Sequence, residues 1–220
     1  MYRTVIFDLD GTLLDTIQDL AAAGNHVCRE NGWPEHTADE FKPMVGHGMQ
    51  NLMVQFSPPE ARNEAQLADT LERFNAYYRR HSMDLTRPFP GIPELLERLR
   101  ADGVQMAVYS NKADEFTTVL MARFFPGTFA LVQGKKDGIP VKPDPTGLYG
   151  ILRALGADAS KTLYVGDSAT DVRTGHNAGL TVCAATWGYR PRKSLEEAGP
   201  EAFAADAAAL ETVIRRGGAD

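Results

Sequence analysis

Two carboxylates stand two residues apart near the start of the chain, directly after an apolar run. Asp8 and Asp10 follow Val5–Phe7, a run that predicts a buried strand. If the chain is still extended there, both side chains point to the same face, and Gly11 permits a tight turn that leaves them at an open edge. Carboxylates this close repel, and a shared proton or a divalent cation is the usual remedy. The alternative is that both are turn formers, because Asp-Gly is a common turn dipeptide.

Groups that suit phosphate binding occur in two later segments. Ser110 and Asn111 end a second strand pattern and can donate hydrogen bonds to phosphate oxygens, although such residues after a strand are also ordinary turn residues. Lys142 precedes Pro143, which favours an extended backbone at the lysine. Fixed there, its ammonium can neutralise a phosphate and an attacking carboxylate together. The alternative is a solvated lysine.

A second pair of acids, Asp167 and Asp171, lies at a strand end and one helical turn later. Either residue could instead only cap the helix. With Asp8 and Asp10 included, we expect four carboxylates to converge on one point. Such a site is electrostatically reasonable only around a hard cation, and oxygen ligands together with a phosphate favour Mg²⁺.

The elements that must position these groups differ before and after Pro90. Residues 16–83 carry helical patterns without a strand signal, which predicts a helical cap domain over residues 15–87. Asp15 or Thr16 can cap the first helix, with Asp19 in a capping-box-like position. The remaining residues, 1–14 and 88–220, form the predicted core domain. The connections at 13–16 and 85–91 are candidate hinges for a lid.

From Pro90 onward, helix and strand patterns alternate. We expect strands at 104–109, 129–133, 162–165 and 180–185, and helices around 95–101, 116–124, 145–155, 169–177 and 207–216. Alternation of this kind predicts an α/β fold with a doubly wound parallel sheet and helices on both faces. Ligands of such sheets bind beyond the carboxyl ends of the strands, where the candidate residues fall.

Bulk properties exclude several classes of function. The 220 residues carry a net charge of −6, which argues against non-specific affinity for nucleic acid or an anionic membrane. No apolar run approaches the roughly 20 residues that span a bilayer. Cys28 and Cys183 have no metal-type spacing and read as buried thiols in a reducing compartment. We expect a cytoplasmic monomer or small homo-oligomer.

The run Asp-x-Asp-Gly-Thr-Leu-x-Asp at residues 8–15 resembles the first motif of the haloacid dehalogenase superfamily, in its phosphatase branch. Three later segments resemble the family's other motifs in the right order. The resemblance implies a Rossmann-like core with an inserted cap, Asp8 as the nucleophile and Asp10 as the general acid/base. It assigns phosphate binding to Ser110, Asn111 and Lys142, with Lys142 preferred over Lys112. It also implies Mg²⁺ binding by the Asp8 and Asp167 side chains and the Asp10 carbonyl, with Asp171 and Thr12 in supporting positions.

The cap position and the Ser-Asn-Lys and Lys-Pro-Asp-Pro segments are most similar to phosphoglycolate phosphatases and close relatives. We therefore expect a Mg²⁺-dependent phosphatase that acts on a small phosphorylated metabolite through an aspartyl-phosphate, with 2-phosphoglycolate as the leading substrate. The alternatives are a phosphomutase, a nucleotide or pyrophosphate phosphohydrolase and, last, a non-catalytic phospho-ligand-binding member. Substrate choice should lie in the cap, where Gly46, His47 and Gly48 form a flexible turn with an imidazole. Such a histidine is more often an exposed loop residue, which is the alternative for His47.

Overall fold

A six-stranded parallel sheet forms the centre of the protein, for which a computed structural model describes residues 1–217. The strands are β1 (Thr4–Phe7), β4 (Gln105–Ala113), β5 (Leu131–Lys135), β6 (Thr162–Gly166), β7 (Thr181–Ala185) and β8 (Ala202–Ala204). Their order in space is β5-β4-β1-β6-β7-β8. The chain order reverses at β1, which is the arrangement of Rossmann-like doubly wound sheets. The predicted α/β fold class is confirmed.

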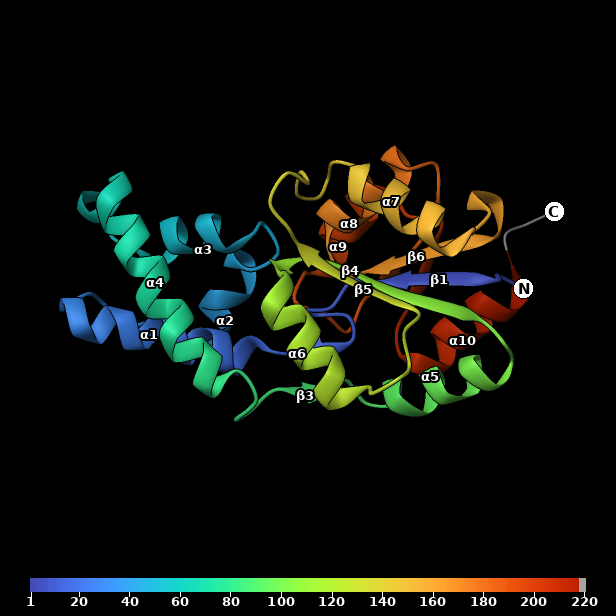
Figure 1. Cartoon of the computed structure of the whole chain (residues 1–220), viewed down its shortest axis with the longest axis horizontal. Helices are drawn as coiled ribbons and strands as arrows, with labels where there is room; N and C mark the ends of the chain where they lie inside the picture. Colours follow the sequence, from blue (N-terminus) through green and yellow to red (C-terminus); the bar gives the residue numbers. More distant parts are fainter. Residues whose placement is uncertain (218–220) are drawn as a thin grey trace.

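Helices cover both faces of this sheet (Figure 1). One layer comprises α5 (Ile92–Ala101), α6 (Asp114–Phe124) and α10 (Ala207–Arg216), and the other α7 (Thr146–Leu155) and α8 (Ala169–Asn177), with α9 (Arg192–Ala198) packed against α8. Val5 and Phe7 belong to the first layer's hydrophobic core, and Ile6 belongs to the second layer's core. This alternation places β1 at the centre of both cores.

The helices between β1 and α5 extend away from the sheet (Figure 1). They are α1 (Ile17–Asn31), α2 (Ala38–Phe41), α3 (Met49–Phe56) and α4 (Glu64–His81), with 3₁₀ turns η1 (Lys42–Met44) and η2 (Pro59–Ala61); a third turn, η3 (Ala159–Lys161), precedes β6. Phe41, Phe56, Phe74 and Tyr78 stack in series, with ring centroids 5.7–6.3 Å apart. These helices thus share a core of their own, while the domain boundaries at 14/15 and 87/88 stay a prediction.

Two segments connect the helical region to the sheet, and they pair with each other as short antiparallel strands. These strands are β2 (Leu14–Asp15) and β3 (Arg87–Pro88). Asp19 lies beside this pair and does not cap α1. Its carboxylate accepts hydrogen bonds from Leu85 N at 2.9 Å and from Thr86 N and Oγ1 at 2.8 Å. The capping-box prediction for Asp19 is therefore wrong, because a buried acid takes the donors of a segment 66 residues away.

The sequence patterns miss the short elements β2, β3, α9 and β8, and end the second strand four residues early, at Tyr109. Cys28 and Cys183 are buried free thiols, as predicted. None of the helices in residues 1–217 is both long and apolar enough to cross a membrane.

Candidate active site

The carboxyl ends of three neighbouring strands supply most of the site. Asp8 follows β1, Ser110–Lys112 lie in the last part of β4, and Asp167 follows β6. Because β4 and β6 both pair with β1 in parallel, these ends meet at one edge of the sheet. The fold therefore assembles the groups that the sequence spacing singled out.

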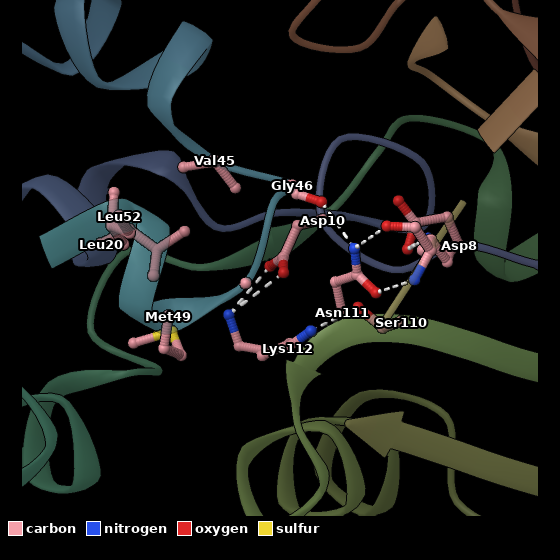
Figure 2. A pocket seen from close by; sticks show the side chains of 12 residues that line it. Asp8, Asp10, Leu20, Val45, Gly46, Met49, Leu52, Ser110, Asn111 and Lys112 are labelled. Atoms are coloured by element: carbon pink, nitrogen blue, oxygen red, sulfur yellow. Dashed lines mark hydrogen bonds and ion pairs between the residues drawn. The ribbon is translucent and has the colours of Figure 1, made fainter. Parts of the chain in front are cut away.

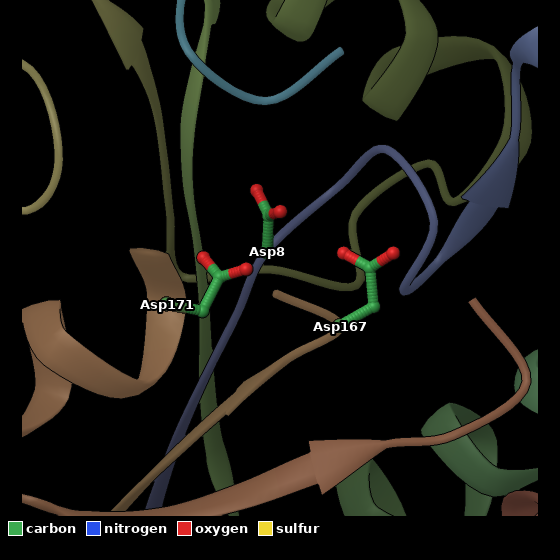
Figure 3. A group of neighbouring side chains, drawn as sticks. All are labelled: Asp8, Asp167 and Asp171. Carbon is green, nitrogen blue, oxygen red and sulfur yellow. The ribbon is translucent and has the colours of Figure 1, made fainter. Parts of the chain in front are cut away.

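Three carboxylates converge at this edge (Figure 3). Asp8, Asp167 and Asp171 are all buried, and one oxygen atom of each lies within 4.8 Å of the others. Asp171 also closes a capping box at the start of α8, where Ser168 Oγ donates to its Oδ2 at 2.5 Å. Asp171 therefore does both things that the sequence allowed: it caps helix α8 and it belongs to the acid cluster.

Three acids lie in this cluster, and Lys142 pairs with only two of them. Burial, with a further contribution from Asp171, raises the pKa of Asp8 to about 7 even though Lys142 opposes the shift. Burial and the two neighbouring acids also raise the pKa of Asp167 well above its usual value. A cation at this point would restore the ionised forms, and three buried carboxylates are the hard oxygen donors that Mg²⁺ prefers. The residues present fit that ion.

Glycines allow the backbone to approach Asp167 from two sides. A Cβ on Gly188 would lie 2.3 Å from Asp167 Cβ, and one on Gly11 would lie 2.3 Å from Asp167 Oδ2. Gly11 also has a φ of +84°, which disfavours other residues. The backbone N–H of Tyr189 donates to Asp167 Oδ2 at 2.7 Å. A backbone N–H thus binds the Asp167 carboxylate, which forms no ion pair with a Lys or Arg of residues 1–217.

Lys142 bridges two of the acids. Its Nζ lies 2.8 Å from Asp8 Oδ1 and 2.7 Å from Asp171 Oδ1, and it also donates to Tyr164 Oη at 3.2 Å. Despite full burial, the two carboxylates keep the pKa of Lys142 well above its usual value, so it stays charged. The solvated-lysine alternative is excluded by this position.

Asp10 is turned away from the acid cluster. Its Oδ1 accepts from Lys112 Nζ at 3.0 Å and from Thr16 Oγ1 at 2.5 Å. The prediction that four carboxylates converge is therefore wrong for Asp10, because its carboxylate forms an ion pair with a second buried lysine, Lys112. Sequence reasoning ranked Lys112 below Lys142; the structure pairs Lys142 with Asp8 and Asp171, and Lys112 with Asp10.

Asp8, Asp10, Ser110, Asn111, Lys112 and Lys142 line one cavity together with the loop before α3 (Figure 2). The Asn111 amide is largely used by the protein: Nδ2 donates to Gly46 O at 2.9 Å, and Oδ1 accepts from Lys142 N at 2.8 Å. Ser110 Oγ accepts from Lys112 N at 3.2 Å and keeps its own proton to donate. Phosphate binding by these residues stays a prediction, with Ser110 the freer donor.

The glycine turn before α3 reaches the cavity only in part. Gly46 and Gly48 line it, whereas His47 is exposed and lines a larger neighbouring cavity of about 920 Å³ between α3, α4 and residues 135–141. The imidazole is nevertheless partly desolvated, which together with the positive charge of Arg190 lowers the pKa of His47. A substrate contact by His47 therefore stays a prediction.

Thr12 is fully buried, and its carbonyl accepts from Trp187 Nε1 at 3.1 Å. Its Oγ1 has no hydrogen-bond partner among residues 1–217. Beside the site, the sequence reasoning missed Arg190, which donates to the carbonyls of Lys42, Pro43 and Val45 in the helical region. No local pattern signals this contact, which spans about 145 residues.

Comparison with known proteins gives matches over most of the chain. A sequence model of the haloacid dehalogenase-like hydrolase family matches residues 5–185. A phosphoglycolate phosphatase of Aquifex aeolicus is 34% identical over 188 residues, 85% of this chain and 86% of that protein. A phosphoglycolate phosphatase of Haemophilus influenzae is 29% identical, with 97% of this chain and 98% of that one covered. A crystal structure from Lactobacillus delbrueckii subsp. bulgaricus, provisionally described as a phosphoglycolate phosphatase, has a TM-score of 0.91 at 33% identity, covering 97% and 98% of the chains.

Proposed function

Since the chain belongs to the haloacid dehalogenase-like hydrolase family and is a phosphoric monoester hydrolase, we propose that it is a Mg²⁺-dependent phosphatase working through an aspartyl-phosphate at Asp8. We propose 2-phosphoglycolate as its substrate. One observation carries the proposal: Asp8 belongs both to the acid cluster and to the cavity lining. The Asp8 carboxylate can thus bind a cation and also reach the phosphorus atom of a substrate in the cavity.

In the first proposed step, an Asp8 oxygen attacks phosphorus while the bond to the leaving oxygen breaks. Asp10 donates a proton to the leaving alkoxide, and Lys142 offsets charge on the phosphoryl oxygens. The Asp8 and Asp167 side chains and the Asp10 carbonyl would hold Mg²⁺, and the ion would supply further neutralisation of that charge. Asp171 keeps Lys142 beside Asp8 through its 2.7 Å ion pair.

In the second proposed step, Asp10 takes a proton from a water molecule that attacks the aspartyl-phosphate. Inorganic phosphate leaves, and the Asp8 carboxylate is restored. Closure of the helical region over the cavity would exclude bulk water from this cycle. The contact between Asn111 and Gly46 O supports such a closed arrangement.

The size of the cavity favours a small substrate. About 30 Å³ is open to the centre of a water-sized sphere, room for roughly two or three water molecules. A nucleotide is far larger than this space, whereas a two-carbon phosphate ester exceeds it much less. The names of the relatives, phosphoglycolate phosphatases from two bacteria, support the same substrate.

The test is Mg²⁺-dependent phosphate release over 2-phosphoglycolate, sugar phosphates, nucleotides and pyrophosphate. We expect release to be fastest from 2-phosphoglycolate, to vanish in Asp8→Asn and to persist in Asp137→Asn, a matched change at an exposed aspartate. Substrate isomerisation without free phosphate would indicate a mutase instead. Absence of turnover, together with failure of beryllium fluoride and Mg²⁺ to bind at Asp8, would refute the phosphatase proposal.

A further inference from the structure

We infer that Lys112 selects substrates whose leaving group carries a carboxylate one carbon away from the bridging oxygen. The inference rests on the proposed function and adds the residue that recognises the leaving group. It starts from a buried lysine that pairs with Asp10 and has no ion pair with Asp8 among residues 1–217. Lys142 already serves the phosphoryl side, through Asp8.

Lys112 presents a charged group with spare donors to the cavity. Its side chain is 2% exposed, and its Nζ lies 3.0 and 3.3 Å from the two oxygens of Asp10 and 4.8 Å from the ring centroid of Tyr78 on α4. An ammonium has three N–H donors, and Asp10 can accept at most two of them. Asp10 therefore leaves at least one donor unused, for which a ligand competes with the nearby Tyr78 hydroxyl.

The position of Asp10 fixes where the leaving group lies. As the proton donor, Asp10 must be within hydrogen-bond distance of the bridging oxygen. In 2-phosphoglycolate one CH₂ separates that oxygen from the carboxylate carbon, so the carboxylate oxygens fall on the order of 3 Å from the bridging oxygen. Because Lys112 Nζ is itself 3.0 Å from Asp10 Oδ1, such a carboxylate comes within reach of the ammonium.

The rest of the leaving-group side is apolar. Figure 2 shows the Asp10–Lys112 pair between Asp8 and Asn111 on one side and Leu20, Met49 and Leu52 on the other. Those apolar side chains offer no partner to the hydroxyls of a sugar. A carboxylate placed among them is stable only if it is paired, and charge-assisted hydrogen bonds in such surroundings are the strong ones. The cavity thus matches one small anionic leaving group.

A second role of Lys112 must be separated from this one. Lys112 also orients Asp10, and loss of that orientation would slow the hydrolysis of every substrate alike. Selection of a carboxylate instead changes the ratio between a substrate that carries the carboxylate and one that lacks it. Ethyl phosphate is the matched probe, because it has the same two-carbon chain without the carboxylate.

The experiment compares kcat/KM for 2-phosphoglycolate and ethyl phosphate in wild type, Lys112→Met and Lys161→Met, the last a control at an exposed lysine. Methionine keeps the apolar stem of Lys112. We expect Lys112→Met to lower the ratio of the two kcat/KM values about 10- to 100-fold, and Lys161→Met to leave it unchanged. An equal loss on both substrates would overturn the inference in favour of a purely positioning role. Wild-type preference for pyrophosphate over 2-phosphoglycolate would overturn the carboxylate assignment.

A binding measurement separates failure of this inference from failure of the proposed function. Calorimetric titration of Asp8→Asn with the two esters in Mg²⁺ requires no turnover. We expect 2-phosphoglycolate to bind more tightly than ethyl phosphate, and Lys112→Met in the Asp8→Asn background to remove that preference. Equal binding of the two esters to Asp8→Asn would overturn the role of Lys112, whether or not the wild type releases phosphate.

Discussion

Without divalent cations, we expect the protein to lose stability between pH 5 and pH 8 because Asp8 is buried among acids. Burial and Asp171 raise the pKa of Asp8 from 3.8 to about 7. A raised folded-state pKa means that the folded protein binds this proton more tightly than the unfolded chain does. Its stabilising contribution is fully present below pH 3.8 and is lost as the pH rises through about 7.

The magnitude follows from the size of the shift. About three pH units correspond to about 4 kcal/mol in total, of which about 2 to 3 kcal/mol falls between pH 5 and pH 8. For a chain of this length, that change is a fall of about 5–10 °C in Tm. The raised pKa of Asp167 acts in the same direction.

The assay is thermal unfolding in EDTA at several pH values, with Asp8→Asn as the comparison. Asparagine cannot ionise, so the variant does not undergo this loss of stability. The Tm of the variant minus that of the wild type should therefore rise by about 5–10 °C between pH 5 and pH 8. Saturating Mg²⁺ should shrink this gain, because metal binding stabilises the ionised wild-type site. Asp137→Asn should follow the wild type. A difference that does not change with pH in EDTA would refute the desolvation of Asp8, and one that Mg²⁺ leaves unchanged would refute its role as a ligand.

Three substitutions test other contacts of the site. Gly188→Ala places a Cβ 2.3 Å from Asp167 Cβ and should weaken Mg²⁺ binding at least tenfold by calorimetry, whereas Gly150→Ala, in open space on α7, should not; equal effects would contradict the close approach. Asp19→Ala leaves buried donors unpaired and should lower the free energy of unfolding by about 1 to 3 kcal/mol in urea titrations, with an unchanged midpoint the opposing result. Arg190→Met removes the donors to three loop carbonyls and should raise KM for the ester more than it lowers kcat; a fall in kcat alone would contradict a role in holding the loop.

Much of the fold could be predicted because its elements have strong local patterns. Apolar runs such as 162–165 stand between helical periodicities, and a parallel sheet brings their carboxyl ends to one edge. The placement of Asp8, Ser110 and Asp167 follows from that topology alone. By contrast, β8 has three residues and α9 has seven, too few for periodicity to distinguish them from loop.

Side-chain pairing was beyond the reach of the sequence patterns. Asp19 has the spacing of a helix cap, yet it bonds to Leu85 and Thr86, which only the return of the chain brings near. Asp10 likewise shares a strand end with Asp8 but takes Lys112 instead of joining the cluster. Local sequence spacing identifies which side chains reach the carboxyl edge of the sheet. Which hydrogen-bond or ion-pair partner each side chain takes depends on distances that the whole fold determines.

The two buried lysines connect the two acids to different parts of the molecule. Lys142 pairs with Asp8 and with Asp171 of α8, so the charges around Asp8 come from residues that flank the sheet. Lys112 pairs with Asp10 and lies over the ring of Tyr78, which belongs to α4 in the helical region. Movement of that region would therefore change the surroundings of Asp10 while leaving the ion pairs of Asp8 intact. The ion pair of Asp10, the proposed proton donor, therefore depends on the position of the helical region through Tyr78, whereas the ion pairs of Asp8 do not.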